Sequence, residues 1–452
     1  MKLITTLLLA TIATTTLGQE KLSLADAIRL GLERNYDIRI EKQNVEVARN
    51  NNSLGEAGFL PSLTVNLDQN NNLTDNVETA FPTATQGQVI TYSLRPSVNL
   101  NWTIFNGLRA HISKDRLEQL QRESMGNAEV VITNTVQAII LAYYKILVDE
   151  ALLSELQRQL DLSRDKYRYT QIRKDIGTAI GTDLILEEGN YLTDSVNLIN
   201  QQLTYKKDKR SLSVLMALDD LTKDYELMDD LTAVSIEDYE FASLLSKLEQ
   251  SNDQLKKAYI GQAIAKQNIQ LSRADRLPTV SLNAGYSDNR QRLDLSNASF
   301  FTGEGFASGP DQPLTSITDT YFINFSVAFT LFNGGRINRA IQNAVVQEDI
   351  NNLRTDQLKT SLTRDLYDAY DNYEVRKVLF NINLRREETA LTNLNVSDEK
   401  FKTGTINSFD YRTVQNLQLS AAIDKLQAMY NLIDAKVSIL KLTGELVDEY
   451  VN

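Results

Sequence analysis

Four segments of the chain alternate between apolar and polar residues, which is the pattern of β-strands with one apolar face and one face toward water. They cover residues 63–67, 97–104, 280–287 and 321–331. In each, one face is apolar and rich in aromatic side chains, and the other carries small polar side chains. A lipid-facing sheet and a half-buried sheet of a soluble sandwich both fit this pattern. The polar segments between the paired strands are expected to be loops, at residues 69–91 and 288–320.

A period of three to four residues predicts long helices elsewhere. Residues 108–175 and 336–403 contain no Pro, and each would form a rod of roughly 100 Å at 1.5 Å per residue. Shorter helices are expected at residues 23–57, 183–218, 241–275 and 408–443. Two short helices placed end to end match one long helix in length. The chain is therefore expected to build a wall of paired antiparallel helices.

Pro and Gly mark the junctions between these elements. Pro61 and Pro278 end the helices that precede two of the strands, because Pro disfavours a helical residue before it. Gly107 and Gly334, each after an Asn, end strands and open the long helices.

Matching residues recur in the two halves at constant spacing. Asn35 and Pro61 correspond to Asn252 and Pro278, and the Phe-Asn-Gly run ending at Gly107 corresponds to the run ending at Gly334. Gene duplication is the simplest account. The expected organisation is a signal peptide at 1–18, a first repeat at 19–218, an acidic connection at 219–240 and a second repeat at 241–452.

The N-terminus reads as a secretory signal peptide. Lys2 precedes an apolar run over residues 3–13, and small residues at Thr16 and Gly18 suit cleavage before Gln19. A short core helix is the alternative. No other run of 18 apolar residues follows, so the exported protein is expected either to be soluble or to enter a membrane as β-strands.

Composition excludes several functions. The 452 residues include no Cys and one His, and the net charge is −12. Disulfides, thiolate sites and multi-histidine metal sites are therefore excluded, and an acidic chain without a basic block is a poor nucleic-acid binder. No catalytic constellation is found: His111 is expected to be solvated, and neither an enzyme nor a cofactor or metal is predicted.

Four strands cannot close a membrane barrel, which needs about eight. An open edge in lipid leaves unpaired N–H and C=O groups, so a membrane-embedded chain must assemble with copies of itself. Two copies would give eight strands with a filled interior, and three would give twelve with a lumen.

The order and duplication of these features resemble the TolC-like outer-membrane efflux factor family. The resemblance covers nearly all of the chain after residue 18. It rests on Leu24, Ala27, Gly31, Leu32 and Asn35 at the first helix, the Leu-Pro-Ser-Leu junction at 60–63, the turns at 105–107 and 332–335, and the Gly-Thr…Asp hairpins at 177–183 and 404–410.

This resemblance implies a mainly α-helical chain with transmembrane β-strands. Three chains would form a twelve-stranded outer-membrane β-barrel continuous with a twelve-helix α-barrel in the periplasm. Such trimers serve as exit ducts for efflux pumps or type I secretion, docked to a periplasmic adaptor and an inner-membrane RND, ABC or MFS transporter. The alternative is a periplasmic coiled-coil adaptor without a channel, and a secreted enzyme is disfavoured because no site is found.

The resemblance also implies that the two helical hairpins form the periplasmic tip, which closes the channel and contacts the adaptor. The implied residues are Gly177, Thr178, Asp183, Phe401, Gly404, Thr405 and Asp410. The glycines permit tight turns. Asp183 and Asp410 either cap helices or line a constriction as an acidic ring that favours cations.

Three positions depart from the family pattern. Phe401 stands where a gating Tyr is common, Ile406 where some members carry an Arg, and Thr413 where some carry a second acidic ring. A gate closed by packing and turn geometry, without an ion-pair latch, is therefore expected.

Overall fold

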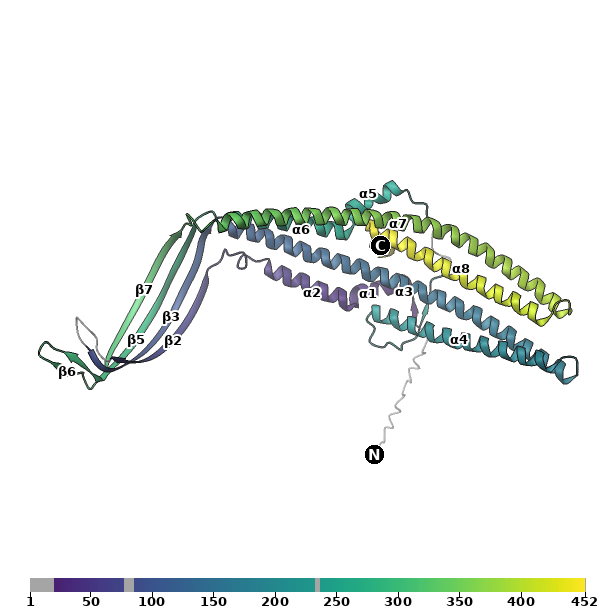
Figure 1. Cartoon of the computed structure of the whole chain (residues 1–452), viewed down its shortest axis with the longest axis horizontal. Coiled ribbons are helices and arrows are strands. Elements are labelled where there is room, and N and C mark those ends of the chain that lie inside the picture. Colours follow the sequence, from purple (N-terminus) through teal and green to yellow (C-terminus); the bar gives the residue numbers. More distant parts are fainter. Residues whose placement is uncertain (1–19, 77–84, 232–235, 452) are drawn as a thin grey trace, which may run out of the picture. The chain divides into compact units, whose positions relative to one another are not determined.

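The computed structural model describes residues 20–76, 85–231 and 236–451, and the expected signal peptide lies outside them. Figure 1 labels the elements along the chain. In order they are β1 (Glu20–Leu22), α1 (Leu24–Arg34), α2 (Tyr36–Asn51), β2 (Ser62–Asn76), β3 (Thr85–Asn106), α3 (Arg109–Asp175), α4 (Gly181–Leu215), β4 (Tyr225–Leu227), α5 (Phe241–Ser251), α6 (Asp253–Ala274), β5 (Thr279–Phe301), β6 (Phe306–Ser308), β7 (Leu314–Ala328), α7 (Arg336–Lys402), α8 (Ser408–Thr443) and α9 (Leu446–Val451).

The chain divides into two compact units, and each takes segments from both expected repeats. The helical unit comprises residues 1–44, 125–258 and 355–452, and the sheet unit comprises residues 45–124 and 259–354. Helices α3 and α7 contain 67 residues each and run through both units. The two long helices predicted from the sequence are thus confirmed to within a residue or two at each end.

The apolar positions of α3 form the core of the helical unit. Val136, Ile139 and Tyr143 are fully buried and pack in one cluster with Ile433 and Val437 of α8. One stretch of α3 is long and apolar enough to cross a membrane, and half of it is buried inside the protein. Its hydrophobicity is therefore explained by helix packing in this core.

The helices predicted at residues 23–57 and 241–275 are each interrupted at an Asn, and the sequence analysis did not predict these breaks. The Asn35 side chain accepts a hydrogen bond from the backbone of the first turn of α2 (2.9 Å) and donates one to the Leu215 carbonyl at the end of α4 (2.9 Å). Asn252 does the same between α6 and the Leu442 carbonyl of α8 (3.1 and 3.0 Å). One carboxamide thus caps the second helix and fixes the joint to a neighbouring helix.

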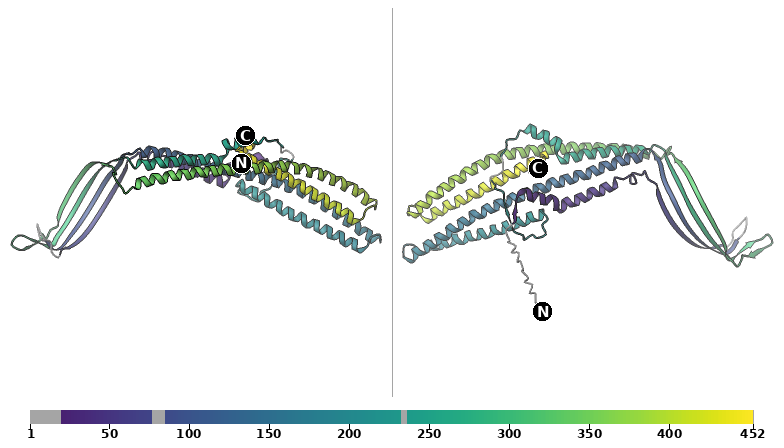
Figure 2. Two further views of the ribbon diagram at one scale, coloured as in Figure 1. Left: turned by 45° about the horizontal axis from the view of Figure 1, so that its top comes forward. Right: turned by 180° about the vertical axis from the view of Figure 1, so that it is seen from behind.

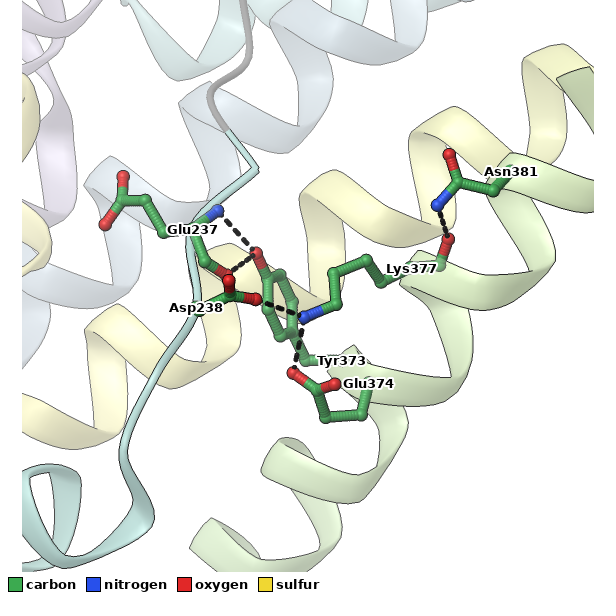
Figure 3. Close-up of polar contacts among 6 residues, drawn as sticks. All are labelled: Glu237, Asp238, Tyr373, Glu374, Lys377 and Asn381. Atoms are coloured by element: carbon green, nitrogen blue, oxygen red, sulfur yellow. Dashed lines mark hydrogen bonds and ion pairs between the residues drawn. The ribbon is translucent and has the colours of Figure 1, made fainter.

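The acidic connection is anchored on the helical unit. Strand β4 pairs in parallel with β1. Further along, the Tyr373 hydroxyl of α7 accepts from the Glu237 N–H (3.1 Å) and donates to the Glu237 carbonyl (2.9 Å), as Figure 3 shows. Lys377 lies beside it and contacts both Asp238 (2.7 Å) and Glu374 (2.9 Å). The described part of this connection is therefore held by β1 at its beginning and by α7 near its end.

The sheet unit contains four long antiparallel strands in the order β2–β3–β5–β7, which lie side by side in the views of Figures 1 and 2. The short β6 pairs with the far end of β5. Within the described residues, β2 pairs only with β3, and β7 pairs only with β5. Both outer edges therefore carry backbone groups that other strands could pair with.

The predicted loops at 69–91 and 288–320 are wrong over most of their length. The β2–β3 ladder continues to the pair Asn76 and Gly87, and the β5–β7 ladder continues to Leu293 and Leu314. These extensions carry polar residues on both faces, so the alternation that marks a strand is missing although the backbone ladder persists. At the other end, β7 stops at Ala328 and not at 331, because its partner there, Thr279, is the first residue of β5.

The register brings the apolar positions of the four strands onto one face. Val65 and Ile323 on this face leave 76 % and 71 % of their surface exposed, which is unfavourable in water and suits lipid. Trp102 lies on the same face, and its ring N–H donates to the Phe59 carbonyl at 2.9 Å. Two complete rows across the sheet are Leu63–Leu100–Ala284–Ile323 and Val65–Val98–Tyr286–Tyr321.

The opposite face is polar. Asn101 and Asn283 pair across β3 and β5 through their side chains, and Asn324 occupies the same row on β7. The alternation read from the sequence is therefore confirmed for the four predicted segments.

The junction glycines adopt left-handed backbone. Gly107 has φ 67° and Gly334 φ 66°, and a Cβ at Gly107 would also lie 2.5 Å from the Ala274 carbonyl. Strands β2 and β5 begin directly after Pro61 and Pro278. The expectation that Pro61 ends the preceding helix is wrong, because α2 already ends at Asn51 and Pro61 only marks the start of β2.

Candidate functional site

Both helical hairpins end their first helix in the same way. Gly177 donates to the Lys174 carbonyl (2.9 Å) while Thr178 donates to the Arg173 carbonyl (2.7 Å). Gly404 and Thr405 make the same two bonds after α7 (3.0 and 2.8 Å). This is the Schellman arrangement, which needs a left-handed residue after the helix. The φ angles of 77° and 72° at the two glycines supply it.

Replacing Gly404 with Ala is expected to cost about 1–2 kcal/mol of unfolding free energy, because an L-residue is strained at this φ. Nothing lies within 4 Å of the added Cβ, so sterics do not contribute. Gly189→Ala, in the exposed interior of α4 with equally open space, is the matched control and should stabilise by about 0.5–1 kcal/mol. Thermal unfolding of the detergent-solubilised variants measures both, and two effects of equal sign would contradict the assignment.

Neither Asp183 nor Asp410 caps its helix, so the capping alternative is wrong for both. Helix α4 has Ile180 at the N-cap without a side-chain bond. Helix α8 is capped by Asn407, whose side chain accepts from the Asp410 N–H at 2.9 Å. Both aspartates are exposed in the first helical turn, where the helix dipole favours a negative charge.

A buried ion pair joins the two hairpins of the chain. Both terminal nitrogens of Arg412 on α8 contact the two carboxylate oxygens of Asp194 on α4, each at 2.7 Å. The Asp194 side chain is only 3 % exposed. This bidentate geometry is the strongest arrangement for such a pair. The hairpins of one chain are therefore held by a specific polar contact.

A second cation lies closer to the turns. Lys166 of α3 contacts Glu187 of α4 at 3.2 Å and donates to the Ser408 carbonyl at the start of α8 at 3.0 Å. Burial lowers the pKa of Lys166, and Glu187 opposes this shift. The Lys166 ammonium also lies 5.0 Å from the ring centre of Phe401 and 5.2 Å from that of Tyr411.

Phe401, which stands where a Tyr is common in the family, packs against an aromatic residue of α8. Its ring stacks on Tyr411 at 4.8 Å, and the Tyr411 hydroxyl donates to Asp398 at 2.9 Å. Burial, and then the bond to Asp398, raise the pKa of Tyr411 to about 12. Phe401 and Tyr411 thus pack as one aromatic pair beside Lys166.

The seam between α3 and α8 is polar near the hairpin turns. Gln159, Ser163, Lys166 and Thr170 follow one another at core spacing on α3 and are buried. Both polar ends of the buried Gln415 side chain have no hydrogen-bond partner within the described part of the chain. Polar side chains thus replace apolar packing along this part of the seam.

The sequence analysis missed Lys166, Glu187, Asp194 and Arg412. A signal was present, because the apolar series Leu153, Leu156 and Leu160 on α3 gives way to polar residues at the same spacing. Buried polar residues at core positions require partners. The partners themselves lie too far along the chain to be assigned from spacing.

A separate carboxyl pair links α3 and α4. Burial, and then the neighbouring Asp149 carboxylate, raise the pKa of Asp208 to about 6. Asp149 is 1 % exposed and receives Lys145 (2.8 Å) and Gln201 (3.0 Å) on one oxygen. Its other oxygen has no hydrogen-bond donor among the described residues, which suits a protonated Asp208.

The folded-state pKa of Asp208 lies above its unfolded value of about 3.9, so its contribution to stability is present below pH 4 and is lost as pH rises through about 6. Asp208→Asn is therefore expected to stabilise the protein by about 1 kcal/mol at pH 8, allowing for partial exposure, and not at pH 4. Thermal unfolding across this range measures it, with the exposed Glu188→Gln on the same helix as control. An equal gain at both pH values would contradict the explanation.

The remaining sequence candidates carry no site. His111 is exposed, with its ring edge-on to Phe59 at 4.8 Å. Across residues 20–76, 85–231 and 236–451, no group of three or more carboxylates or imidazoles is arranged to hold a metal ion.

Long helical hairpins joined to an open sheet with one apolar face are the features of an outer-membrane channel protein. The chain belongs to the outer membrane efflux protein family, whose sequence model matches residues 27–217 and 244–445. The resemblance read from the sequence is thus confirmed. The two matched segments lie within the proposed repeats.

The individual relatives have low sequence identity to this chain but match it over most of its length. The chain is 20 % identical to the outer membrane protein TolC of Escherichia coli K12 over 363 residues, covering 78 % of this chain and 70 % of TolC. It is 21 % identical to the outer membrane efflux protein BepC of Brucella suis over 438 residues, covering 95 % and 87 %. The CmeC outer membrane channel of Campylobacter jejuni has the same fold, with a TM-score of 0.72 at 13 % identity over 94 % of this chain and 86 % of CmeC. All three relatives are outer-membrane proteins by name.

Proposed function

We propose that three copies of this chain form a passive exit channel through the outer membrane. The observation that carries this proposal is the sheet with one apolar face and two outer edges, β2 and β7, each paired on one side only. In lipid, an unpaired N–H or C=O group costs several kcal/mol. Pairing β2 of one copy with β7 of the next removes both edges. Three copies give twelve strands with a lumen, whereas two give eight strands and a filled interior.

The channel serves as the outer component of a tripartite efflux or type I secretion system. A periplasmic adaptor docks at the hairpins and connects the channel to an inner-membrane RND, ABC or MFS transporter. Efflux is favoured over protein secretion because both the family and its member BepC are described as outer membrane efflux proteins. The cleaved signal peptide at residues 1–18 directs the chain to this location.

The first test is the mass of the protein extracted from membranes in detergent, with the bound detergent subtracted in light scattering. A mass of three mature chains is expected, together with ion conductance after reconstitution into a planar bilayer. A water-soluble monomer would contradict the proposal, because the apolar sheet face would then have to be buried within one chain.

We further propose that the hairpin turns form the constriction of this channel. Asp183 and Asp410 are exposed in the first turns of α4 and α8, so three chains would bring six carboxylates together and favour cations. Single-channel recordings of Asp183→Ala and Asp410→Ala are expected to show reduced cation selectivity. Unchanged selectivity in both would exclude the acidic ring while leaving the channel itself in place.

A further inference from the structure

The apolar face of the sheet changes character at one level of the strands. Tyr286 and Tyr321 form the last aromatic pair, with ring centres 4.8 Å apart. The next row on the same face carries Asp288 opposite Asp319, and the rows after it carry Arg290 and then Arg292. The helices join the sheet at the other end of the strands. In an outer-membrane channel with periplasmic helices, these rows therefore lie toward the cell exterior.

The two arginines line a hollow of about 290 Å³ on this face. Leu94 pairs with Arg290, and Tyr92 pairs with Arg292, in the neighbouring strand. The side chains of Gln69, Asn71 and Thr315 add amide and hydroxyl groups to its lining, and Ile317 adds apolar surface. The hollow thus combines hydrogen-bond donors with an apolar wall on the side of the lipid face.

Among the described residues, two guanidinium groups and no carboxylate line the hollow, and the carboxylates beside it are each engaged by a neighbouring side chain or backbone group. Asp288 is taken up by Arg290, whose Nε and one terminal nitrogen both lie 2.8 Å from the same oxygen, and Asp319 accepts from the Tyr286 hydroxyl at 2.7 Å. Asp294 uses one oxygen for the Ser296 N–H and hydroxyl. Arg292 is exposed and forms no ion pair within the residues that the structure describes. It is available for a ligand anion.

We propose that this hollow binds the phosphate of a lipid headgroup in the outer leaflet of the outer membrane. Arg290 lies four residues beyond Tyr286, or roughly 10 Å along the membrane normal for a tilted strand, which places its guanidinium at the outer edge of a headgroup layer about 5–8 Å thick. A guanidinium binds phosphate through two parallel hydrogen bonds. The acyl chains of the same lipid would continue along the apolar rows below.

The test uses the full assembly in phosphatidylcholine nanodiscs titrated with bisphosphorylated lipid A, with the lipid retained per chain measured by native mass spectrometry. Arg292→Gln is expected to weaken retention by about tenfold, the effect of losing a charge-assisted hydrogen bond. Asp288→Asn, which frees Arg290, is expected to strengthen it. Arg95→Gln is the matched control, because Arg95 lies on the opposite face of β3, and it should change nothing.

Dephosphorylated lipid A identifies the group that is recognised, and it should bind the wild type and Arg292→Gln equally. Equal retention of bisphosphorylated lipid A by the wild type and Arg292→Gln would overturn the proposal. So would displacement of the lipid by inorganic phosphate at matched concentration, which would make the hollow a general anion site.

Discussion

Replacing Arg412 with Ala is expected to destabilise the contact between the two hairpins by about 3–5 kcal/mol, because Asp194 is left buried without its cation. The Asp194 side chain is 3 % exposed and both of its oxygens are used by Arg412. The hairpin on α7 and α8 should therefore separate more readily from the hairpin on α3 and α4.

Two measurements check this result. Thermal unfolding in detergent should show a lower midpoint, and bilayer recordings should show a larger or more frequent open state if the hairpins form the constriction. Arg386→Ala is the control, because its 2.7 Å pair with Asp424 joins α7 and α8 at sites that are 51 % and 42 % exposed. Such a pair contributes about 1 kcal/mol at most. Equal losses in the two variants would show that burial of the Arg412 pair is not the reason.

Ile323→Arg is expected to prevent stable insertion of the sheet, at a cost of about 2–4 kcal/mol per chain. Ile323 lies in the middle of the apolar face, in one row with Leu100 and Ala284. A guanidinium there would have to leave water. Because an assembled trimer contains the substitution three times, even the lower cost per chain should abolish the membrane-extracted oligomer.

Asn324→Arg supplies the matched control for this substitution. Asn324 is the next residue on the same strand and points to the polar face with Asn283. It should assemble normally and change only the ion selectivity. The oligomer content of extracted membranes, compared with total expression, measures both variants, and equal assembly of the two would contradict the assignment of the lipid face.

The spacing of apolar residues and the positions of Pro and Gly were sufficient to predict most of the fold. The long helices were predicted because α3 and α7 bury a stripe of apolar residues over many turns, and residues such as Ile139 and Tyr143 repeat at helical spacing. The lipid-facing parts of the strands were predicted because lipid and water impose strict alternation there. Pro61 and Pro278 marked the starts of β2 and β5, and Gly107 marked the end of β3.

The same signals vanish where both faces of an element are polar. The strand extensions around Asn71 and Arg292 are continued by backbone ladder bonds, which leave no mark in the side-chain pattern. The breaks at Asn35 and Asn252 were also invisible, because the buried positions keep helical spacing through them.

The candidate site was predicted only in outline. The Gly177 and Gly404 turns follow from local chemistry, since Gly is the residue that most easily adopts left-handed backbone. The pair of Arg412 and Asp194 depends on two helices far apart in the chain, and its geometry was not contained in any local motif. Asn407, and not Asp410, caps α8, a distinction that rests on backbone angles.

The position of Trp102 allows the fluorescence of the unmodified protein to report on one site of the sheet. It is the sole Trp of a sequence without Cys, it lies on the apolar face of the sheet, and its ring N–H is bound to the Phe59 carbonyl. Tryptophan emission from the unmodified protein therefore comes from a single site in the lipid-facing band. Quenching by brominated acyl chains would follow membrane insertion during assembly, and any introduced Cys would be a unique site for a second label.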